Sequence, residues 1–136
     1  MNYWLIKSEP YVYSYDDLTH DKKTSWDGVR NYAARNYMRE MKKGDQVFFY
    51  HSNEGKQIVG IATISKEAYP DPTAVDNKGW VSVEIKPLKK LKKFITLVDV
   101  RVEKILSEME LVKNSRLSVQ KVSSKEWIKI LKMAGE

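Results

Sequence analysis

The sequence predicts an α+β domain in which about five β-strands form a small curved sheet or barrel, with short helices between them. Segments with apolar residues at every second position alternate along the chain with segments of helical spacing. Turn residues separate these segments, and no internal repeat, low-complexity tract or linker interrupts them. Because 136 residues is a typical length for one domain, we expect a single domain over residues 1–136.

The first strand is expected from Tyr3 to Lys7, where aromatic and β-branched residues lead into a turn at Pro10. Side chains alternate between the two faces of a strand, so Lys7 and Ser8 should lie on opposite faces. Ser14 precedes two aspartates and is typical of an N-cap residue, which predicts a short helix.

A longer helix is expected after Asn31, because four apolar residues stand at i, i+3, i+4 and i+7: Ala34, Tyr37, Met38 and Met41. Asn31 and Arg35 border this apolar stripe, where they could form the wall of a pocket. Tyr32 and Asn36 lie away from it. We expect Gly44 to end the helix in the left-handed conformation.

The middle of the chain predicts three strands. Residues Asp45 to Ser52 and Gln57 to Ser65 are expected to form a hairpin, with its loop at residues 53–56. The second of these strands is apolar on both faces, so it should be internal. Gly60 within it predicts a bulge or a close backbone contact. Trp80 to Leu88 alternates between apolar and polar residues and predicts the third strand.

The C-terminal part begins with five lysines between Lys86 and Lys93. Such a run is typical of a solvated strand edge that resists pairing, and a phosphate-binding strip is the alternative. Thr96 is expected to start a short helix with a capping box. Leu117 to Val122 predicts the last strand. A final helix should follow Ser123, with Trp127 in its buried stripe.

The residue inventory favours binding over catalysis. The chain has no cysteine, which excludes disulfides, thiolate zinc sites and cysteine nucleophiles. Its two histidines, His20 and His51, lack metal-ligand spacing, and no glycine-rich phosphate loop is present. His51 and Ser52 are adjacent in a strand, so they should point to opposite faces and cannot pair as base and nucleophile. We therefore expect no metal, no cofactor and no enzyme activity.

The formal net charge of +6 suggests a polyanionic partner, although a modest surplus also serves solubility. Residues 1–30 carry four Lys and Arg against five Asp and Glu, so the surplus lies further along the chain. The N-terminal segment reaches a charged residue too soon for a signal peptide, and no apolar run could span a membrane. We expect a cytoplasmic monomer without a membrane partner.

The segment WDGVRNYAARN, residues 26–36, is the candidate binding stretch. It contains one glycine and three pairs of functional residues, which are Trp26 and Tyr32, Arg30 and Arg35, and Asn31 and Asn36. Aromatic rings can stack on bases, arginines bind phosphate, and asparagine amides can read a base edge. Gly28 would let backbone approach a ligand closely. The alternative is a turn and a surface helix whose aromatic residues belong to the core.

Several motifs in order along the chain resemble an EVE domain: YWLIKSEP (3–10), WDGVRNYAARN (26–36), FFYHS (48–52), IVGIA (58–62), YPDPT (69–73) and SRLSVQ (115–120). The resemblance covers essentially the whole chain. It implies a PUA-like barrel with helices packed around it, kinship with YTH and ASCH domains, and binding of modified bases in DNA or RNA without catalysis. Two positions depart from the family pattern: Ala33 replaces the usual glutamine, and Lys121 often corresponds to proline.

YTH domains bind a base in a cage. By the resemblance to them, Lys7 and Ser8 at the strand end and Trp26 correspond to positions in this cage. We therefore expect Trp26 to be a ligand residue rather than a core residue and to stack on one extruded base. Five residues are expected to supply hydrogen bonds: Lys7, Ser8, Asn31, His51 and Ser52. Three more are expected to hold backbone or brace the loop: Arg30, Arg35 and Asn36. Tyr32 is also a candidate binding residue, because its ring offers a second flat face on which a base could stack.

Three alternatives stay open. Arg30 and Asn31 could only tie the loop that carries Trp26 to the sheet. His51 could be a hydrogen-bonded structural residue, or the general base of a base-processing hydrolase. The basic strip could instead meet an acidic protein partner.

Overall fold

The computed structural model describes all 136 residues and contains six strands. The strands are β1 (Tyr3–Ser8), β2 (Thr24–Trp26), β3 (Gln46–His51), β4 (Gln57–Pro70), β5 (Val81–Thr96) and β6 (Val119–Val122). The helices are α1 (Tyr15–Asp21), α2 (Tyr32–Glu40), α3 (Leu97–Val102), α4 (Glu110–Lys113) and α5 (Ser124–Met133), with a 3₁₀ turn at Lys104–Leu106. The predicted α+β class is confirmed.

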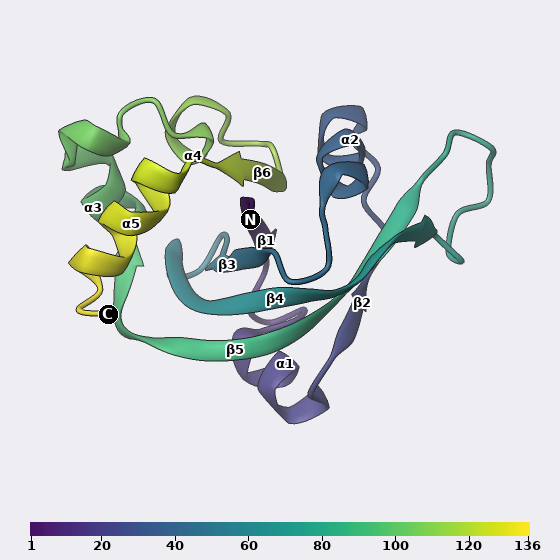
Figure 1. The fold of residues 1–136 in the computed structure, drawn as a ribbon, viewed down its shortest axis with the longest axis horizontal. Coiled ribbons are helices and arrows are strands. Elements are labelled where there is room, and N and C mark those ends of the chain that lie inside the picture. Colours follow the sequence, from purple (N-terminus) through teal and green to yellow (C-terminus); the bar gives the residue numbers. More distant parts are fainter.

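One mixed sheet contains every strand, in the order β2-β5-β4-β3-β1-β6. β1 pairs in parallel with β3, and all other neighbours are antiparallel. The long strands β4 and β5 bend strongly, which gives the sheet the curvature of a barrel wall (Figure 1). The edge strands β2 and β6 do not pair with each other, so the barrel-like sheet remains open. The sixth strand is β2, whose three residues are too short to show strand periodicity.

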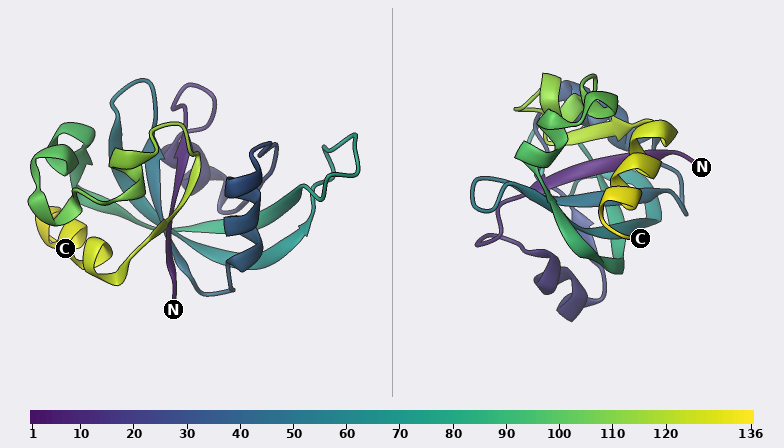
Figure 2. Two further views of the ribbon diagram at one scale, coloured as in Figure 1. Left: turned by 90° about the horizontal axis from the view of Figure 1, so that it is seen from above. Right: turned by 90° about the vertical axis from the view of Figure 1, so that its left-hand side faces the viewer.

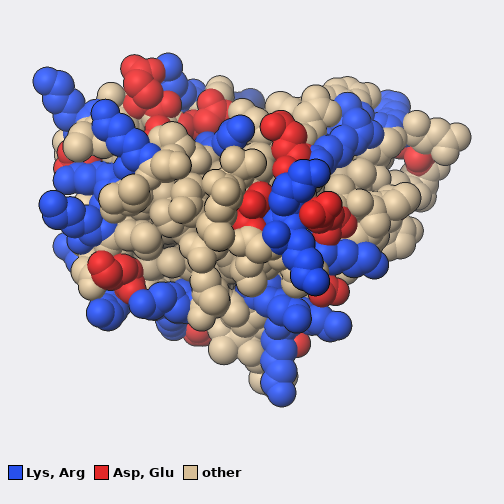
Figure 3. All heavy atoms as spheres, viewed as in Figure 1, with Lys and Arg blue, Asp and Glu red and all other residues tan.

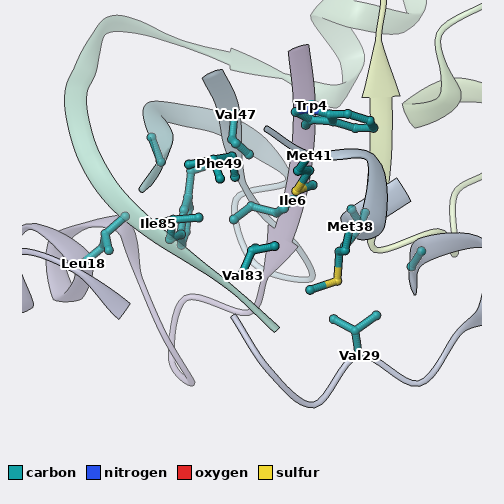
Figure 4. Packing of buried hydrophobic residues seen from close by; sticks show 14 of the residues in the cluster. Trp4, Ile6, Leu18, Val29, Met38, Met41, Val47, Phe49, Val83 and Ile85 are labelled. Atoms are coloured by element: carbon teal, nitrogen blue, oxygen red, sulfur yellow. The ribbon is translucent and has the colours of Figure 1, made fainter. Parts of the chain in front are cut away.

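Alternation along β1 and β3 divides the apolar side chains between two cores. Trp4, Ile6 and Phe49 lie on one face, where buried residues of α1 and α2 cover them (Figure 4). Leu5 and Phe48 lie on the other face, beneath α3, α4 and α5. The C-terminal helices therefore gather at one end of the molecule, as Figures 1 and 2 show.

The helix starts follow the sequence expectations. Ser14, Thr96 and Ser123 each form a capping box, and the side chain of Asn31 accepts a hydrogen bond from Ala34 N at the start of α2. The end of α2 differs from the expectation, because the helix stops at Glu40 and Met41 is already extended. Gly44 does have a positive φ of 94°. Its N–H bonds to Ile64 O, so it shapes the turn into β3 rather than capping the helix.

Gly60 marks both a bulge and a close contact, as expected. The register of β4 against β5 shifts between Ile58 and Gly60. A Cβ atom at position 60 would lie 2.6 Å from ring atoms of Tyr15. That ring is held in place because Tyr15 Oη donates to Ile61 O at 2.7 Å. Only glycine leaves room for it.

None of the helices combines the length and the apolar character that crossing a membrane requires.

Candidate nucleic-acid interface

The end of β1 separates two hollows on opposite faces of the sheet. Lys7 pairs with Tyr50 in the β1–β3 register, and Ser8 pairs with His51. The segment after β1 and the hairpin between β3 and β4 project on the same side of the molecule (Figure 2, left). They are joined by the Ser52 N–H, which donates to Ser8 O at 2.9 Å. Functional side chains near this end therefore face one hollow or the other.

The first hollow lies around Trp26 and has a volume of about 390 Å³. We call it the Trp26 hollow; its lining residues are Ser8, Val12, Tyr13, Thr24, Ser25, Trp26 and Asp27. Two rings meet the indole steeply: the centroid of Phe49 is 5.6 Å away at 78° and that of Tyr13 is 6.2 Å away at 69°. No ring stacks parallel on Trp26, so this orientation leaves parallel stacking open to a ligand.

Trp26 also contacts the core, which qualifies the sequence expectation that it would be a ligand residue alone. Its side chain is half-buried and packs against the cluster that contains Phe49. The other three tryptophans are buried, with exposed fractions of 0% for Trp4, 7% for Trp80 and 2% for Trp127. Trp26 is thus the one tryptophan that has both a core contact and a solvent-facing surface.

Two further residues of the Trp26 hollow were not singled out from the sequence. The Asp27 carboxylate makes no hydrogen bond or ion pair within the chain and is exposed beside the indole. The Tyr13 hydroxyl donates to Asp21 Oδ2 at 2.9 Å, and burial raises the pKa of Tyr13 to about 12. Ser8 Oγ donates to Tyr13 O at 2.5 Å, so this hydroxyl keeps its lone pairs for a ligand. The sequence does carry a signal for Asp27 as a candidate binding residue, because it directly follows Trp26.

Lys7 and Ser52 line the second hollow, of about 210 Å³, on the opposite face. Tyr50, Lys56 and Arg101 share its wall, and we call it the cationic hollow. Lys7 Nζ donates to Ser115 O at 2.6 Å, and burial lowers the pKa of Lys7. The expectation that Lys7 and Ser8 would serve one base is therefore not supported by the geometry, because adjacent side chains on a strand diverge.

His51 makes a hydrogen bond within the chain. Its Nε2 accepts a hydrogen bond from Tyr15 N at 3.1 Å, at the start of α1. Burial is the largest influence on the imidazole and lowers the pKa of His51. With Nε2 accepting from backbone, the neutral imidazole carries its proton on Nδ1.

The loop between β2 and α2 is braced by a buried carboxylate. Asp71 Oδ2 accepts from Gly28 N at 2.8 Å and from Arg30 Nη1 at 2.9 Å, while Asp71 Oδ1 accepts from Thr73 N at 2.7 Å. Burial by itself raises the pKa of Asp71, but the hydrogen bonds from Thr73, Arg30 and Gly28 outweigh it and hold the pKa well below its usual value. Arg30 thus ties the loop to the end of β4.

Asn31 lies beside a third hollow of about 660 Å³, between α2 and the segment that precedes β6. Arg116, Lys113 and Ser115 also line this hollow, and Ser115 lines the cationic hollow too. The Asn31 side-chain oxygen caps α2 at 2.9 Å from Ala34 N, so the amide nitrogen is the part left for a ligand.

Tyr32, Arg35 and Asn36 form a separate cluster around Trp80. The Tyr32 ring stacks on the Trp80 ring, with centroids 5.1 Å apart, and Arg35 Cζ lies 4.8 Å from the Tyr32 centroid. Arg35 also donates to Lys78 O at 2.7 Å and to Asn36 Oδ1. None of these three residues lines the Trp26 hollow.

On the face shown in Figure 3, basic side chains are interspersed with acidic ones. The lysine run lies on β5. One edge of β5 pairs with β4, and on the other edge β2 pairs only with Val83 to Ile85, so the lysine run has an open edge. Lys90 pairs with Asp16 at 2.9 Å, and Lys89 pairs with Glu136. The position of the run agrees with an edge-protecting role. No group of three or more His, Asp or Glu side chains is arranged to hold a metal ion.

Comparison with known proteins shows similarity along the whole chain. A family model described as the EVE domain matches residues 2–133. Thymocyte nuclear protein 1 of Gallus gallus is 36% identical, over 98% of this chain and 69% of that protein.

Solved structures show the same fold. The NMR structure of Rpa0253 from Rhodopseudomonas palustris is 50% identical and covers 99% of this chain and 94% of its own, with a TM-score of 0.94. The crystal structure of human THYN1 protein with DNA that contains 5-methylcytosine is 34% identical and covers 100% and 99% of the two chains, with a TM-score of 0.91. The YTH domain of Zygosaccharomyces rouxii MRB1, at 16% identity and a TM-score of 0.58 over 98% and 86% of the two chains, shows likeness of fold.

Proposed function

The chain belongs to the EVE domain family, and we propose that it binds nucleic acid by holding one extruded, modified base in the Trp26 hollow. The observation that carries this proposal is the half-buried Trp26 ring, which lines a hollow of about 390 Å³. The rings of Phe49 and Tyr13 contact it edge-on, so no protein ring occupies its stacking face. A base stacked on such a ring contributes on the order of 1–3 kcal/mol.

The edge of the base would be read by the polar groups of the hollow. The Asp27 carboxylate can accept hydrogen bonds from an exocyclic amino group, and Ser8 Oγ can accept one more. The apolar side chain of Val12 and the edge of Tyr13 would contact a methyl group. This combination suits a methylated base that keeps an amino group.

The known relatives support the same reading. The human THYN1 protein, at 34% identity, was crystallised with DNA that contains 5-methylcytosine. We therefore propose a base modified by a small group such as a methyl. Extrusion of a base from a duplex costs a few kcal/mol, so we expect a weakened or single-stranded site to bind more tightly than a stable duplex.

We propose that Asn31 together with Arg116 holds the strand beside the base, because both line the hollow of about 660 Å³ next to α2. In this proposal Arg30, Tyr32, Arg35 and Asn36 brace the loop that presents Trp26, and His51 positions α1. Lys7 and Ser52 serve the opposite side of β1.

We propose binding without catalysis. A hydrolase would need a free base, and His51 Nε2 already accepts a hydrogen bond from Tyr15 N. Incubation with a modified oligonucleotide separates the two functions, because a binding protein returns the oligonucleotide unchanged. Turnover of the modified base would contradict the proposal.

The first experiment is an affinity panel. Oligonucleotides of one sequence would carry 5-methylcytosine, N6-methyladenine or no modification, each as DNA and RNA in single- and double-stranded form. We expect at least one modified form to bind more tightly than its unmodified counterpart. Equal affinity across the panel would leave nucleic-acid binding intact but would contradict recognition of a modification.

The second experiment tests the position of the base. Trp26→Ala should weaken binding of the best oligonucleotide by about tenfold or more, because a stacking partner is lost. Trp26→Phe should keep part of the affinity. Tyr32→Ala is the comparison, since this exposed ring lies in the Trp80 cluster, and it should weaken binding much less. If Trp26→Ala stays folded and binds as tightly as the parent, the base lies elsewhere.

A further inference from the structure

The cationic hollow has three positive side chains in its wall and no acidic one. Lys7, Lys56 and Arg101 line it together with hydroxyl and amide groups. An adjoining hollow of about 470 Å³ shares Lys56, Arg101 and Asn53, and its wall also lacks aspartate and glutamate. On the face shown in Figure 3, by contrast, acidic side chains are interspersed with the basic ones.

Separate elements bring these cations together. Lys7 and Tyr50 face the hollow from paired positions of β1 and β3, with Lys7 Nζ 5.9 Å from the Tyr50 ring centroid. Lys56 belongs to the hairpin after β3, and Arg101 belongs to α3. The hairpin is joined to α3 by the Leu97 N–H, which donates to Lys56 O at 2.8 Å. The arrangement is therefore held by backbone contacts rather than by the side chains themselves.

The cations have few partners within the chain. No side-chain hydrogen bond or ion pair engages Lys56 or Arg101, and the Lys7 ammonium donates only to the carbonyl Ser115 O. Positive groups that converge without a carboxylate repel one another. An anion in the hollow would relieve this repulsion and receive charge-assisted hydrogen bonds.

Tyr50 adds a neutral donor. Its side chain is only 3% exposed, yet its hydroxyl makes no hydrogen bond within the chain, and the residue lines the hollow. Burial raises the pKa of Tyr50, and the nearby Arg101 charge opposes this effect without reversing it. The hydroxyl therefore stays protonated at neutral pH and can donate to an anion.

We propose that the cationic hollow is a phosphate-binding site in which Lys56, Arg101 and Tyr50 supply the selective donors. The phosphate has two possible sources: the backbone of the strand whose base occupies the Trp26 hollow, or a small phosphorylated compound. The first source rests on the proposed function. Lys7 and Ser8 are neighbours at the end of β1, so a strand that places a base on one side of this end passes close to the other.

The direct test is titration with inorganic phosphate at constant ionic strength, followed by calorimetry and by amide chemical shifts. Lys56→Gln and Arg101→Gln should each weaken phosphate binding by about tenfold, as expected for the loss of a charge-assisted bond. The control is Lys125→Gln, which removes the same charge from an exposed position on α5 and should bind as the parent does.

Tyr50→Phe sharpens the test, because it removes one hydroxyl and no charge. We expect several-fold weaker phosphate binding with an unchanged melting temperature. Two results would overturn the proposal. One is equal phosphate affinity of the parent and of the Tyr50, Lys56 and Arg101 variants, and the other is no phosphate binding by the parent.

Oligonucleotide binding distinguishes the two sources. If the strand supplies the phosphate, Arg101→Gln should make the slope of log affinity against log salt shallower by about 0.7 for a single strand or 0.9 for a duplex. An unchanged slope, with inorganic phosphate binding lost, supports the site with a small phosphorylated compound as its ligand. If the parent binds no oligonucleotide, the proposed function fails, while the phosphate titration still decides on this site.

Discussion

Trp26 and Trp127 are both tryptophans on short elements, but their rings meet different neighbours. Trp127 lies parallel to Phe48, with centroids 3.7 Å apart, and to Tyr3 at 4.5 Å. Trp26 meets only the steeply inclined rings of Phe49 and Tyr13. Protein rings therefore fill the stacking positions of Trp127 and leave that of Trp26 available. Because Trp26 also packs on the core, Trp26→Ala should lower the free energy of unfolding by about 1–2 kcal/mol, less than a fully buried ring would.

Gly60→Ala should destabilise the protein by about 1–3 kcal/mol, because the added methyl group meets the Tyr15 ring at 2.6 Å. The ring cannot retreat easily, since its hydroxyl is bonded to Ile61 O. Denaturant unfolding measures the effect. Lys66→Ala, at an exposed position of the same strand, is the control and should change stability by less than about 0.5 kcal/mol. Equal stability of the two variants would show that α1 can shift away from β4.

At the scale of elements, one long-range attachment holds the loop beside the candidate site, and another holds a helix to the sheet. The loop between β2 and α2 is tied to the end of β4 through the Asp71 carboxylate, which accepts from Gly28 N and Arg30 Nη1. The helix α5 is attached to the other face of the sheet through Trp127. The first attachment governs the mouth of the Trp26 hollow, and the second governs the overall stability.

Asp71→Asn should lower stability at pH 7 by about 2–3 kcal/mol, because the buried donors lose their charged acceptor. The folded-state pKa of Asp71 lies below its ordinary value of 3.8. Its contribution to stability is therefore fully present above that value and is lost progressively as the pH falls from it toward the lower folded-state pKa. The difference between parent and variant should shrink below about pH 4 in denaturant unfolding. Asp76→Asn, at an exposed position of the same loop, is the control. A difference that does not shrink between pH 4 and pH 2 would contradict this account.

Trp127→Ala should destabilise the protein by about 3–5 kcal/mol, because a ring that is 2% exposed leaves a cavity between α5 and the sheet. Thermal and denaturant unfolding give the value. Ile128→Ala is the matched control, because this neighbouring side chain on the same helix is 64% exposed. Unchanged stability of Trp127→Ala would mean that α5 is not anchored by its aromatic contacts.

At the scale of the whole molecule, the net charge of +6 is not gathered into one continuous basic area on the face that Figure 3 shows. Acidic groups separate the basic ones in Figure 3, and Arg30, Lys89 and Lys90 are engaged in ion pairs. The lysine run follows a strand edge and is partly neutralised by Asp16 and Glu136. Affinity for nucleic acid should therefore rest on a few phosphate contacts and on the base itself.

The logarithm of oligonucleotide affinity should fall with the logarithm of salt concentration at a slope no steeper than roughly −4, given about −0.7 to −0.9 for each phosphate contact. Affinity measured at several salt concentrations gives the slope. A slope near −8 would point instead to the lysine run as the main binding surface.

The local pattern of the sequence was sufficient for most of the elements, but it did not predict α4 or the full length of β4 and β5. The capping boxes at Ser14, Thr96 and Ser123 depend on residues three positions apart, and strand alternation depends on immediate neighbours, so both are visible without the fold. The buried stripe of Trp127 and the close contact at Gly60 are local signals of the same kind. The strand β2 was missed because three residues are too few for a period.

Only the tertiary structure decided which candidate residues meet. The family resemblance had already placed Ser8 near Trp26, but the tertiary structure separates Lys7 from them into another hollow and engages Arg30 with a carboxylate 41 positions away. Such partners are set by the order of strands in the sheet and by where its loops converge, and neither leaves a signal in neighbouring residues. The sequence by itself therefore determined most of the elements and the family resemblance, whereas long-range packing determined the walls of the hollows.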